Sequence, residues 1–188
     1  GTTLGEGAGF VVIERGGLRD SVTHARLRGY GLSGDAYHET SPEPRGRGVA
    51  AAIRSALEDA GASESEIGYF NAHGTGTVAN DTAEWCAVQS VFGSDLGGSL
   101  PLSSSKGHFG HAQSAAGVLE VIGTLECMRA GLAHLQHGRR AVTSHPCKHH
   151  ANNAVAMRRG GAEQQIDGGH IGFEPIMPQV PDATGIVI

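Results

Sequence analysis

Hydrophobic and polar positions alternate with two different periods along the first two thirds of this chain. Apolar residues recur every three to four positions over 48–61, 79–92 and 112–130, which predicts three helices that each bury one face. Short apolar runs at 67–70 and 100–103 stand between these segments and predict buried strands. Helices that alternate with short strands predict an α/β fold, with a mixed, mostly parallel sheet and helices on its faces.

Two further apolar runs precede the first predicted helix. A glycine-rich turn leads into Phe10–Ile13, and residues 24–34 alternate between apolar and polar positions. Because few residues join the two runs, we expect two strands that pair antiparallel. The proline- and glycine-rich residues 35–48 predict a polar loop before the first helix.

The ends of the predicted elements carry their own signals. Gly61 and Gly93 follow the last apolar positions of two helical patterns, where glycine commonly ends a helix. Ser63 and Glu66 have the spacing of a capping box.

The periodicity decays after about residue 133. Residues 134–150 hold five of the 11 histidines without any period, and only 185–188 is typical of a strand. We therefore divide the chain into residues 1–132, one α/β unit, and residues 133–188, a divergent tail. The cluster His145–His150 raises the alternative of a metal site, but its spacing fits no zinc pattern, so we expect no metal.

Length and charge narrow the class of protein. The 188 residues suffice for one domain, and the net charge of -5, with 14 scattered basic residues, argues against nucleic acid or an anionic membrane as the partner. No apolar run reaches the roughly 20 residues that span a bilayer. The N-terminus has neither Met nor the features of a signal peptide, so it resembles a start within a domain. Three irregularly spaced cysteines predict no disulfide framework, so we expect a cytoplasmic protein.

Candidate chemistry follows the two buried strand patterns. Asn71–Thr77 places His73 between small and hydroxyl residues, and Ser103–His111 adds Lys106 and His111. Polar residues at strand ends before a helix are where α/β proteins commonly place their chemistry. A structural histidine in a capped turn is the alternative for the first loop.

Lysine is scarce in this chain, with Lys106 and Lys148 standing against 12 arginines. A lysine kept in a Ser- and Gly-rich loop indicates that a compact positive charge is needed there, rather than the planar, bidentate guanidinium of arginine. Two imidazoles and an ammonium from adjacent strand ends can converge on one oxygen that becomes negative, which is the chemistry of enolate or oxyanion stabilisation.

These motifs resemble the β-ketoacyl-[acyl carrier protein] synthase family, the condensing enzymes of fatty acid and polyketide synthesis, which have a thiolase-like fold. His-Gly-Thr-Gly-Thr, Ser-Ser-Ser-Lys-x-x-x-Gly-His and the preceding Leu-Gly-Glu-Gly-Ala-Gly follow the order of the family. Further segments that fit are 34–42, 59–61, 67–69, 81–84 and 115–117.

The resemblance implies catalytic roles for three residues. His73 and His111 would hydrogen-bond the malonyl thioester carbonyl and stabilise the enolate formed on decarboxylation. Lys106 would orient or charge-stabilise His111 and its loop. His108 has no catalytic place in the motif and is expected to be solvated.

The resemblance also implies supporting residues and partners. Thr75 and Thr77 would bind the amides of a phosphopantetheine arm, while Glu84, and more weakly Asp81, would anchor the Lys106 loop. The implied reaction is a decarboxylative Claisen condensation without a cofactor, because the substrates are carried on phosphopantetheine. An acyl carrier protein and a second ketosynthase subunit, as homodimer or heterodimer, are the implied partners.

The chain departs from the family pattern at two places. The family's nucleophilic cysteine sits on a strand-to-helix elbow, whereas Cys86 and Cys127 fall in helical patterns and Cys147 in the irregular tail. Residues 169–174 only faintly resemble the family's C-terminal glycine-rich loop. The chain thus resembles the C-terminal half of a ketosynthase domain. A non-catalytic remnant, or a partner subunit without the cysteine, is the alternative.

Overall fold

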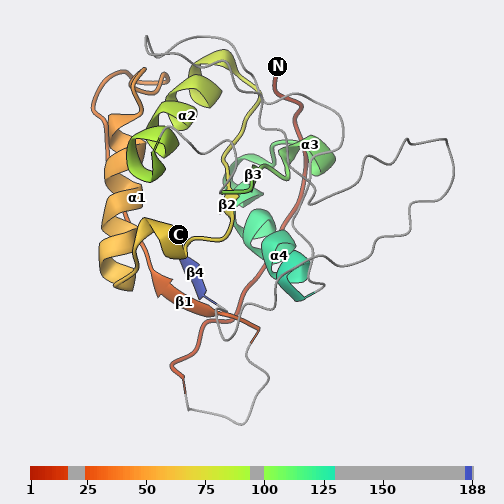
Figure 1. Ribbon diagram of the computed structural model, residues 1–188. Coiled ribbons are helices and arrows are strands. Elements are labelled where there is room, and N and C mark those ends of the chain that lie inside the picture. Colours follow the sequence, from red (N-terminus) through yellow and green to blue (C-terminus); the bar gives the residue numbers. More distant parts are fainter. Residues whose placement is uncertain (17–23, 94–99, 130–184, 188) are drawn as a thin grey trace, which may run out of the picture.

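A computed structural model describes residues 1–16, 24–93, 100–129 and 185–187. In these ranges helices and short strands alternate, which confirms the predicted α/β class (Figure 1). The elements in chain order are β1 Arg26–Gly29, α1 Arg47–Ala60, the 3₁₀ helix η1 Glu64–Glu66, β2 Phe70–Asn71, α2 Val78–Phe92, β3 Leu102–Ser103, α3 Lys106–Phe109, the 3₁₀ helix η2 Gln113–Ala115, α4 Ala116–Arg129 and β4 Gly185–Val187.

The described strands form two parallel pairs. β2 pairs with β3 in the register Phe70 to Leu102 and Asn71 to Ser103. β1 pairs with β4, the segment that the sequence marks as strand-like near its end. In Figure 1, β2 and β3 lie at the centre, with α1 and α2 to one side and α3 and α4 to the other. The parallel register brings the C-terminal ends of β2 and β3 to one edge, where both histidine loops begin.

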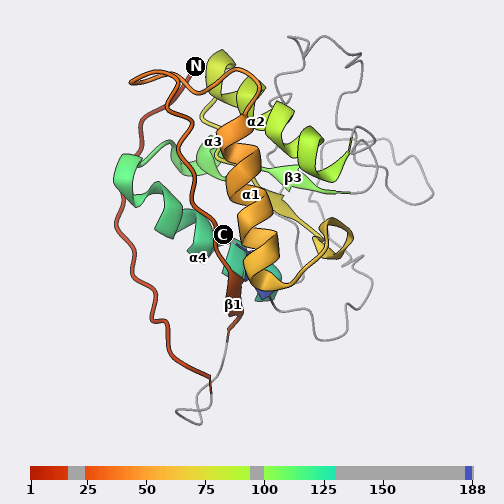
Figure 2. The ribbon, with the colours of Figure 1, turned by 90° about the vertical axis from the view of Figure 1, so that its left-hand side faces the viewer.

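The helix α1 begins and ends at glycines in the left-handed conformation. Gly46 has φ 63° and Gly61 has φ 59°, and the Gly61 N–H bonds to carbonyls of the last turn. Along its length α1 packs against the chain that contains β1, beside it in Figure 2. A Cβ added to Gly31 would lie 2.0 Å from the Ala52 carbonyl oxygen, so glycine permits this close approach.

The core lies where α1, α2 and the pair β2–β3 meet. Val88 on α2 and Leu100 before β3 are buried at its centre. Phe70 and Phe92 contact edge to face, with ring centroids 6.1 Å apart. The partly buried side chains packed around them are Ile53, Ile67, Phe70, Trp85, Phe92 and Leu102. This packing holds α2, which supports the first histidine loop, against the strands that carry both loops.

The local signals at the helix ends are confirmed. Gly93 ends α2 through a hydrogen bond from its N–H to the Gln89 carbonyl, 3.0 Å long. The Glu66 carboxylate accepts hydrogen bonds from the backbone N–H and the hydroxyl of Ser63, at 2.7 and 2.9 Å. These hydrogen bonds lower the pKa of Glu66, because they favour its charged form.

The prediction of an antiparallel strand pair near the N-terminus is wrong. Phe10–Ile13 forms no strand in the described part of the chain, and Phe10 is 93% exposed. β1 pairs with β4 in parallel instead of with this segment. Backbone pairing near the N-terminus occurs earlier, where Leu4 bridges His111. The apolar run therefore has the composition of a buried strand without a described neighbour that would bury it.

Two other expectations have different outcomes. The predicted helix at 112–130 begins with the 3₁₀ turn η2, and the α-helix proper starts at Ala116. Residues 130–184 lie outside the described residues, so the division at 132/133, the His145–His150 cluster and the loop at 169–174 stay predictions.

Helices of membrane-spanning length and apolarity are not found among the described residues.

The two left-handed glycines of α1 provide a matched test of the contact between α1 and α2. A Cβ on Gly46 would lie 2.0 Å from the Ala83 carbonyl oxygen, whereas a Cβ on Gly61 would meet nothing within 4 Å. We expect Gly61→Ala to lower the free energy of unfolding by about 1–2 kcal/mol through backbone strain alone. Gly46→Ala adds overpacking and should cost about 2–5 kcal/mol. Urea denaturation followed by circular dichroism measures both, and equal losses would contradict this packing.

Candidate active site

The first histidine loop connects β2 to α2 and is anchored by a buried carboxylate. Glu84, on the second turn of α2, is 8% exposed. Its two oxygens accept hydrogen bonds from the backbone N–H groups of His73, at 2.6 Å, and Gly74, at 2.9 Å. Asp81, one turn earlier, accepts from the Gly76 N–H at 3.2 Å. Both acidic residues therefore fix the backbone of this loop.

This arrangement corrects the role expected for the two carboxylates. Glu84 and Asp81 anchor the His73 loop, not the Lys106 loop. The reason is local, because α2 begins directly after the loop and its first turns lie beneath it. Burial raises the pKa of Glu84, and the two backbone hydrogen bonds oppose that rise only in part.

The second loop follows β3 and is buried at its start. Ser104, Ser105 and Lys106 have low exposure, and the Ser104 hydroxyl donates to the carbonyls of His73 and Gly74 at 3.4 Å. A Cβ on Gly74 would lie 2.5 Å from the Ser104 Cβ, so glycine is needed where the two loops touch. The two loops thus form one unit.

The backbone of His111 is held by the N-terminal segment. Its N–H donates to the Thr3 carbonyl at 2.7 Å, and its carbonyl accepts from the Gly5 N–H at 3.1 Å. Gly110, with φ 78°, lies against Gly5, and an added Cβ there would meet the Gly5 nitrogen at 2.8 Å. The motif glycines of both segments therefore permit this contact.

Lys106 contacts His73 rather than His111, which corrects the expected role. Its ammonium donates to His73 Nδ1 at 3.2 Å and forms an ion pair with the Glu120 carboxylate on α4. Lys106 is 6% exposed, so its charge lies in the interior and requires a counter-charge there. Glu120 supplies that charge, and the ammonium lies between this carboxylate and His73 Nδ1.

Sequence reasoning missed Glu120. A signal was present, since Glu120 is the first charged residue of the otherwise apolar start of α4. A carboxylate on an apolar helix is either paired or functional, and here it pairs with Lys106.

His73 is held in one neutral form by its surroundings. Burial and, next, the positive charge of Lys106 lower the pKa of His73 below the ordinary value of 6.5. An ammonium can only donate, so Nδ1 of His73 must accept, and the ring proton is assigned to Nε2. The buried pair Lys106–Glu120 thus makes His73 a hydrogen-bond donor through Nε2.

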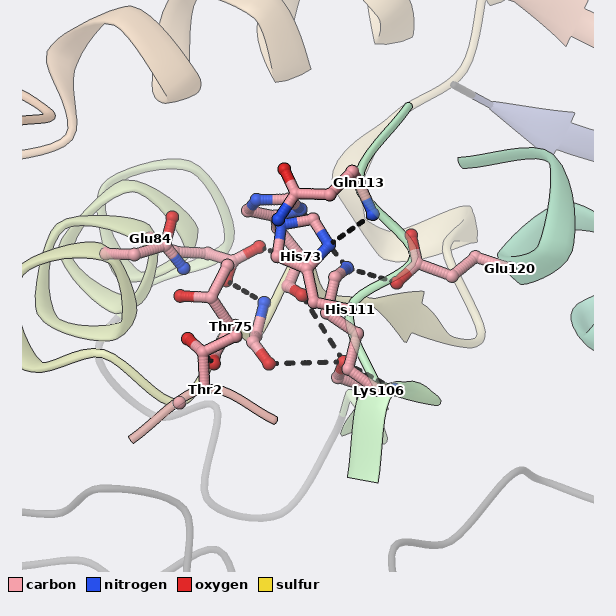
Figure 3. Close-up of polar contacts among 12 residues, drawn as sticks. Thr2, His73, Thr75, Glu84, Lys106, His111, Gln113 and Glu120 are labelled. Atoms are coloured by element: carbon pink, nitrogen blue, oxygen red, sulfur yellow. Dashed lines mark hydrogen bonds and ion pairs between the residues drawn. The ribbon is translucent and has the colours of Figure 1, made fainter. Parts of the chain in front are cut away.

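His111 reaches the same state by another route. Its Nδ1 accepts the backbone N–H of Gln113 at 3.2 Å, so its ring proton is likewise assigned to Nε2. The rings of His73 and His111 contact edge to face, with centroids 5.3 Å apart and an interplanar angle of 89° (Figure 3). Two imidazoles side by side, each able to donate from Nε2, can stabilise one developing oxyanion.

Both imidazoles border a cleft with a volume of about 460 Å³. Thr75 and Thr77 also line the cleft, and their hydroxyls lie 2.9 Å apart. That they bind an extended polar ligand stays a prediction. The side chains and backbone that line the cleft belong to Thr2, Leu4, Thr40, Pro42, His73, Thr75, Thr77, Ala79, Asn80, His111 and Gln113. Lys106 lies behind His73 and supports the cleft from the interior.

Thr2 and Gln113 are among the lining residues that sequence reasoning missed. The Thr2 hydroxyl donates to the Thr75 carbonyl at 2.7 Å, which ties the N-terminal segment to the first loop. Gln113 follows the second loop and has φ 51°, an unusual value for a residue other than glycine. No periodicity marks either residue, because both act through the turns that they occupy.

The described cysteines lie away from the cleft lining. Cys86 is buried in the middle of α2, and Cys127 lies within α4. Burial raises the pKa of the Cys127 thiol, which is the opposite of what activates a nucleophile. His108 is exposed on α3, as expected. Within the described ranges no three His, Cys, Asp or Glu side chains gather in a way that could hold a metal ion.

Comparisons with known proteins agree with this geometry. Residues 24–139 match the family model "Beta-ketoacyl synthase, C-terminal domain". The chain is 40% identical over 136 residues to 3-oxoacyl-[acyl-carrier-protein] synthase 2 of Coxiella burnetii, a match that covers 71% of this chain and 33% of that protein. It is 42% identical over 128 residues to the synthase of the same name from Vibrio harveyi, covering 66% and 31%. The chain thus spans about a third of the length of these curated relatives.

Solved structures show the same relationship. The ketosynthase ApeO, in complex with its chain length factor ApeC from Xenorhabdus doucetiae, is similar with a TM-score of 0.52 and 43% identity, over 58% of this chain and 27% of that chain. A type II polyketide acyl carrier protein in complex with its ketosynthase, AntDE:AntF, gives a TM-score of 0.53 and 36% identity, over 55% and 25%.

The pKa of His73 should depend on Lys106. In the parent chain we expect His73 to titrate below 6.5, because burial and the ammonium disfavour the imidazolium. Stability contributed by the neutral ring is then present above pH 6.5 and lost as pH falls. Lys106→Met should raise the titration midpoint, measured by NMR of the imidazole resonances.

The double variant Lys106→Met, Glu120→Gln is the control for this titration. It also removes the Glu120 carboxylate, because the charge of that carboxylate raises the pKa of His73. A midpoint in the double variant that stays above that of the parent attributes the shift to the ammonium. A midpoint that does not move in either variant would contradict the contact between Lys106 and His73.

Proposed function

Since the chain belongs to the β-ketoacyl synthase family, we propose that its cleft binds a malonyl thioester and promotes the decarboxylation that begins carbon–carbon bond formation. The observation that carries this proposal is that His73 and His111 both line the cleft and both have Nδ1 engaged in a hydrogen bond, which leaves Nε2 of each ring as the donor for a ligand. Two such donors suit a thioester carbonyl oxygen that becomes an enolate oxygen.

During decarboxylation, negative charge develops on the thioester oxygen. The thioester carbonyl accepts hydrogen bonds from His73 and His111. The bond between the α-carbon and the carboxylate breaks, carbon dioxide leaves, and the electron pair forms the enolate, whose oxygen carries the negative charge. The donors are stronger partners for that enolate oxygen than for the neutral carbonyl, so they lower the barrier. Lys106 acts from behind by keeping His73 neutral and correctly oriented.

The substrate carrier is proposed from the hydroxyl pair and the family. Thr75 and Thr77 would hydrogen-bond the amides of a phosphopantetheine arm, which positions the thioester beneath the imidazoles. An acyl carrier protein would deliver this arm. No further cofactor is needed for the step, because the thioester itself accepts the electron pair.

The complete reaction would be a decarboxylative Claisen condensation in fatty acid or polyketide synthesis. The enolate carbon would attack an acyl thioester, release its thiol and form a β-ketoacyl product. By analogy with the family, the acyl-carrying thiol would come from a part of the synthase outside the described residues. A second ketosynthase subunit, as homodimer or heterodimer, is proposed by analogy with relatives such as the ketosynthase–chain length factor complex.

A second candidate is a non-catalytic ketosynthase-like subunit that binds the pantetheine thioester or pairs with a competent partner. The position of the described cysteines favours it, since neither Cys86 nor Cys127 lines the cleft. Purified chain that forms ketoacyl product from acyl and malonyl carrier proteins would exclude this candidate. Product that forms only after a competent ketosynthase subunit is added would support it.

Decarboxylation can be tested without the condensing thiol. We expect His73→Ala and His111→Ala each to slow carbon dioxide release from malonyl-carrier protein about 10²- to 10³-fold, because each removes one donor to the enolate oxygen. Release of labelled carbon dioxide by the purified chain measures the rate.

His108→Ala is the matched control, because His108 is an exposed histidine on the same loop system. It should release carbon dioxide at the parent rate. A His73→Ala variant as fast as the parent would refute the role assigned to the imidazole pair.

A further inference from the structure

Gln113 adopts a backbone conformation that its residue type disfavours. Its φ of 51° lies in the left-handed region, where glycine alone is free of strain. The conformation directs its N–H to His111 Nδ1 at 3.2 Å. Glycine would make the same backbone hydrogen bond without strain, so the backbone alone does not account for glutamine. Strained residues cluster at ligand sites, so the Gln113 side chain is the part of this residue with a candidate function.

Gln113 lines the cleft together with His73 and His111. In Figure 3 its carboxamide extends on the side of the His73 and His111 rings. A carboxamide offers two N–H donors and one acceptor. Asn80, which also lines the cleft, already donates to Asp81 at 3.2 Å.

The residues that line this cleft include no lysine or arginine. Lys106 is 6% exposed and is engaged by Glu120 and His73, so its ammonium is directed away from the cleft. An anionic ligand group in the cleft therefore meets neutral donors. Hydrogen bonds from neutral N–H groups to a carboxylate are shorter and stronger than those to an uncharged acceptor.

Neutral donors suit a carboxylate that must leave as carbon dioxide. When the carbon–carbon bond breaks, negative charge moves from the carboxylate to the enolate oxygen. A cation paired with the carboxylate would stabilise the ground state more than the transition state and would slow the step. A neutral carboxamide binds the carboxylate but stabilises the ground state less than a cation would. It should therefore affect substrate affinity and selectivity more than the rate of decarboxylation.

We propose that the side-chain carboxamide of Gln113 binds the free carboxylate of the malonyl unit and thereby distinguishes a malonyl from an acetyl thioester. This inference rests on the proposed function, because it places the thioester carbonyl at His73 and His111. It adds a specificity-determining residue next to the imidazole pair.

The test compares two ligands that differ only in the carboxylate. The probes are the amide analogues of malonyl-pantetheine and acetyl-pantetheine, in which nitrogen replaces the thioester sulfur, and calorimetry measures both affinities. We expect the parent chain to bind the malonyl analogue about tenfold more tightly. Gln113→Gly keeps the backbone conformation and removes the carboxamide, so the two affinities should become equal with acetyl binding unchanged.

A second variant tests charge at constant shape. Gln113→Glu should bind the malonyl analogue more weakly than the acetyl analogue, because two carboxylates repel. Gln89→Glu, the same change on α2 away from the cleft lining, is the matched control and should keep the parent preference.

The outcomes separate this inference from the proposed function. A parent chain that binds both analogues equally, or Gln113 variants that keep the malonyl preference, would overturn the role of Gln113 alone. A parent chain that binds neither analogue would overturn the proposed function as well.

Discussion

The site depends on one buried charge, the ammonium of Lys106. A charge removed from water is tolerated in a protein interior only when partners replace its hydration. Glu120 on α4 supplies the opposite charge, and His73 Nδ1 accepts a hydrogen bond from the same ammonium. The loop after β2, the loop after β3 and the helix α4 must therefore meet at this point. Any arrangement that separates them leaves a buried charge unpaired.

The contact between Lys106 and His73 also determines which ring nitrogen of His73 carries the proton. The ammonium cannot accept a hydrogen bond, so it selects the His73 tautomer that donates from Nε2. Glu84 fixes the backbone of that residue from the other side, through its N–H. The imidazole is thus constrained at its ring and at its backbone by groups outside the cleft. This leaves the cleft face of the ring for a ligand.

Local signals made the elements and both histidine loops predictable from the sequence. The glycines after α1 and α2 and the capping box at Ser63 concern neighbouring residues, and they hold in the structure. The partners of Lys106, Glu84 and Thr2 were not predictable in this way. They depend on which segments meet in space. The charge of Glu120 in the apolar start of α4 indicates that it is paired, but not with which residue. The segment Phe10–Ile13 shows the reverse case, because apolar composition predicts burial only where a neighbouring element exists to provide it.

The N-terminal segment has a consequence for the order of folding. Thr2 bonds to Thr75, and Thr3 bonds to His111, so the contacts that tie the histidine loops span 73 and 108 residues of chain. Closing loops of that length is slow compared with the formation of helices such as α1 or α2, whose hydrogen bonds are local. The helices can therefore form before the cleft exists. Binding competence would then appear in the last steps of folding, after most secondary structure is complete.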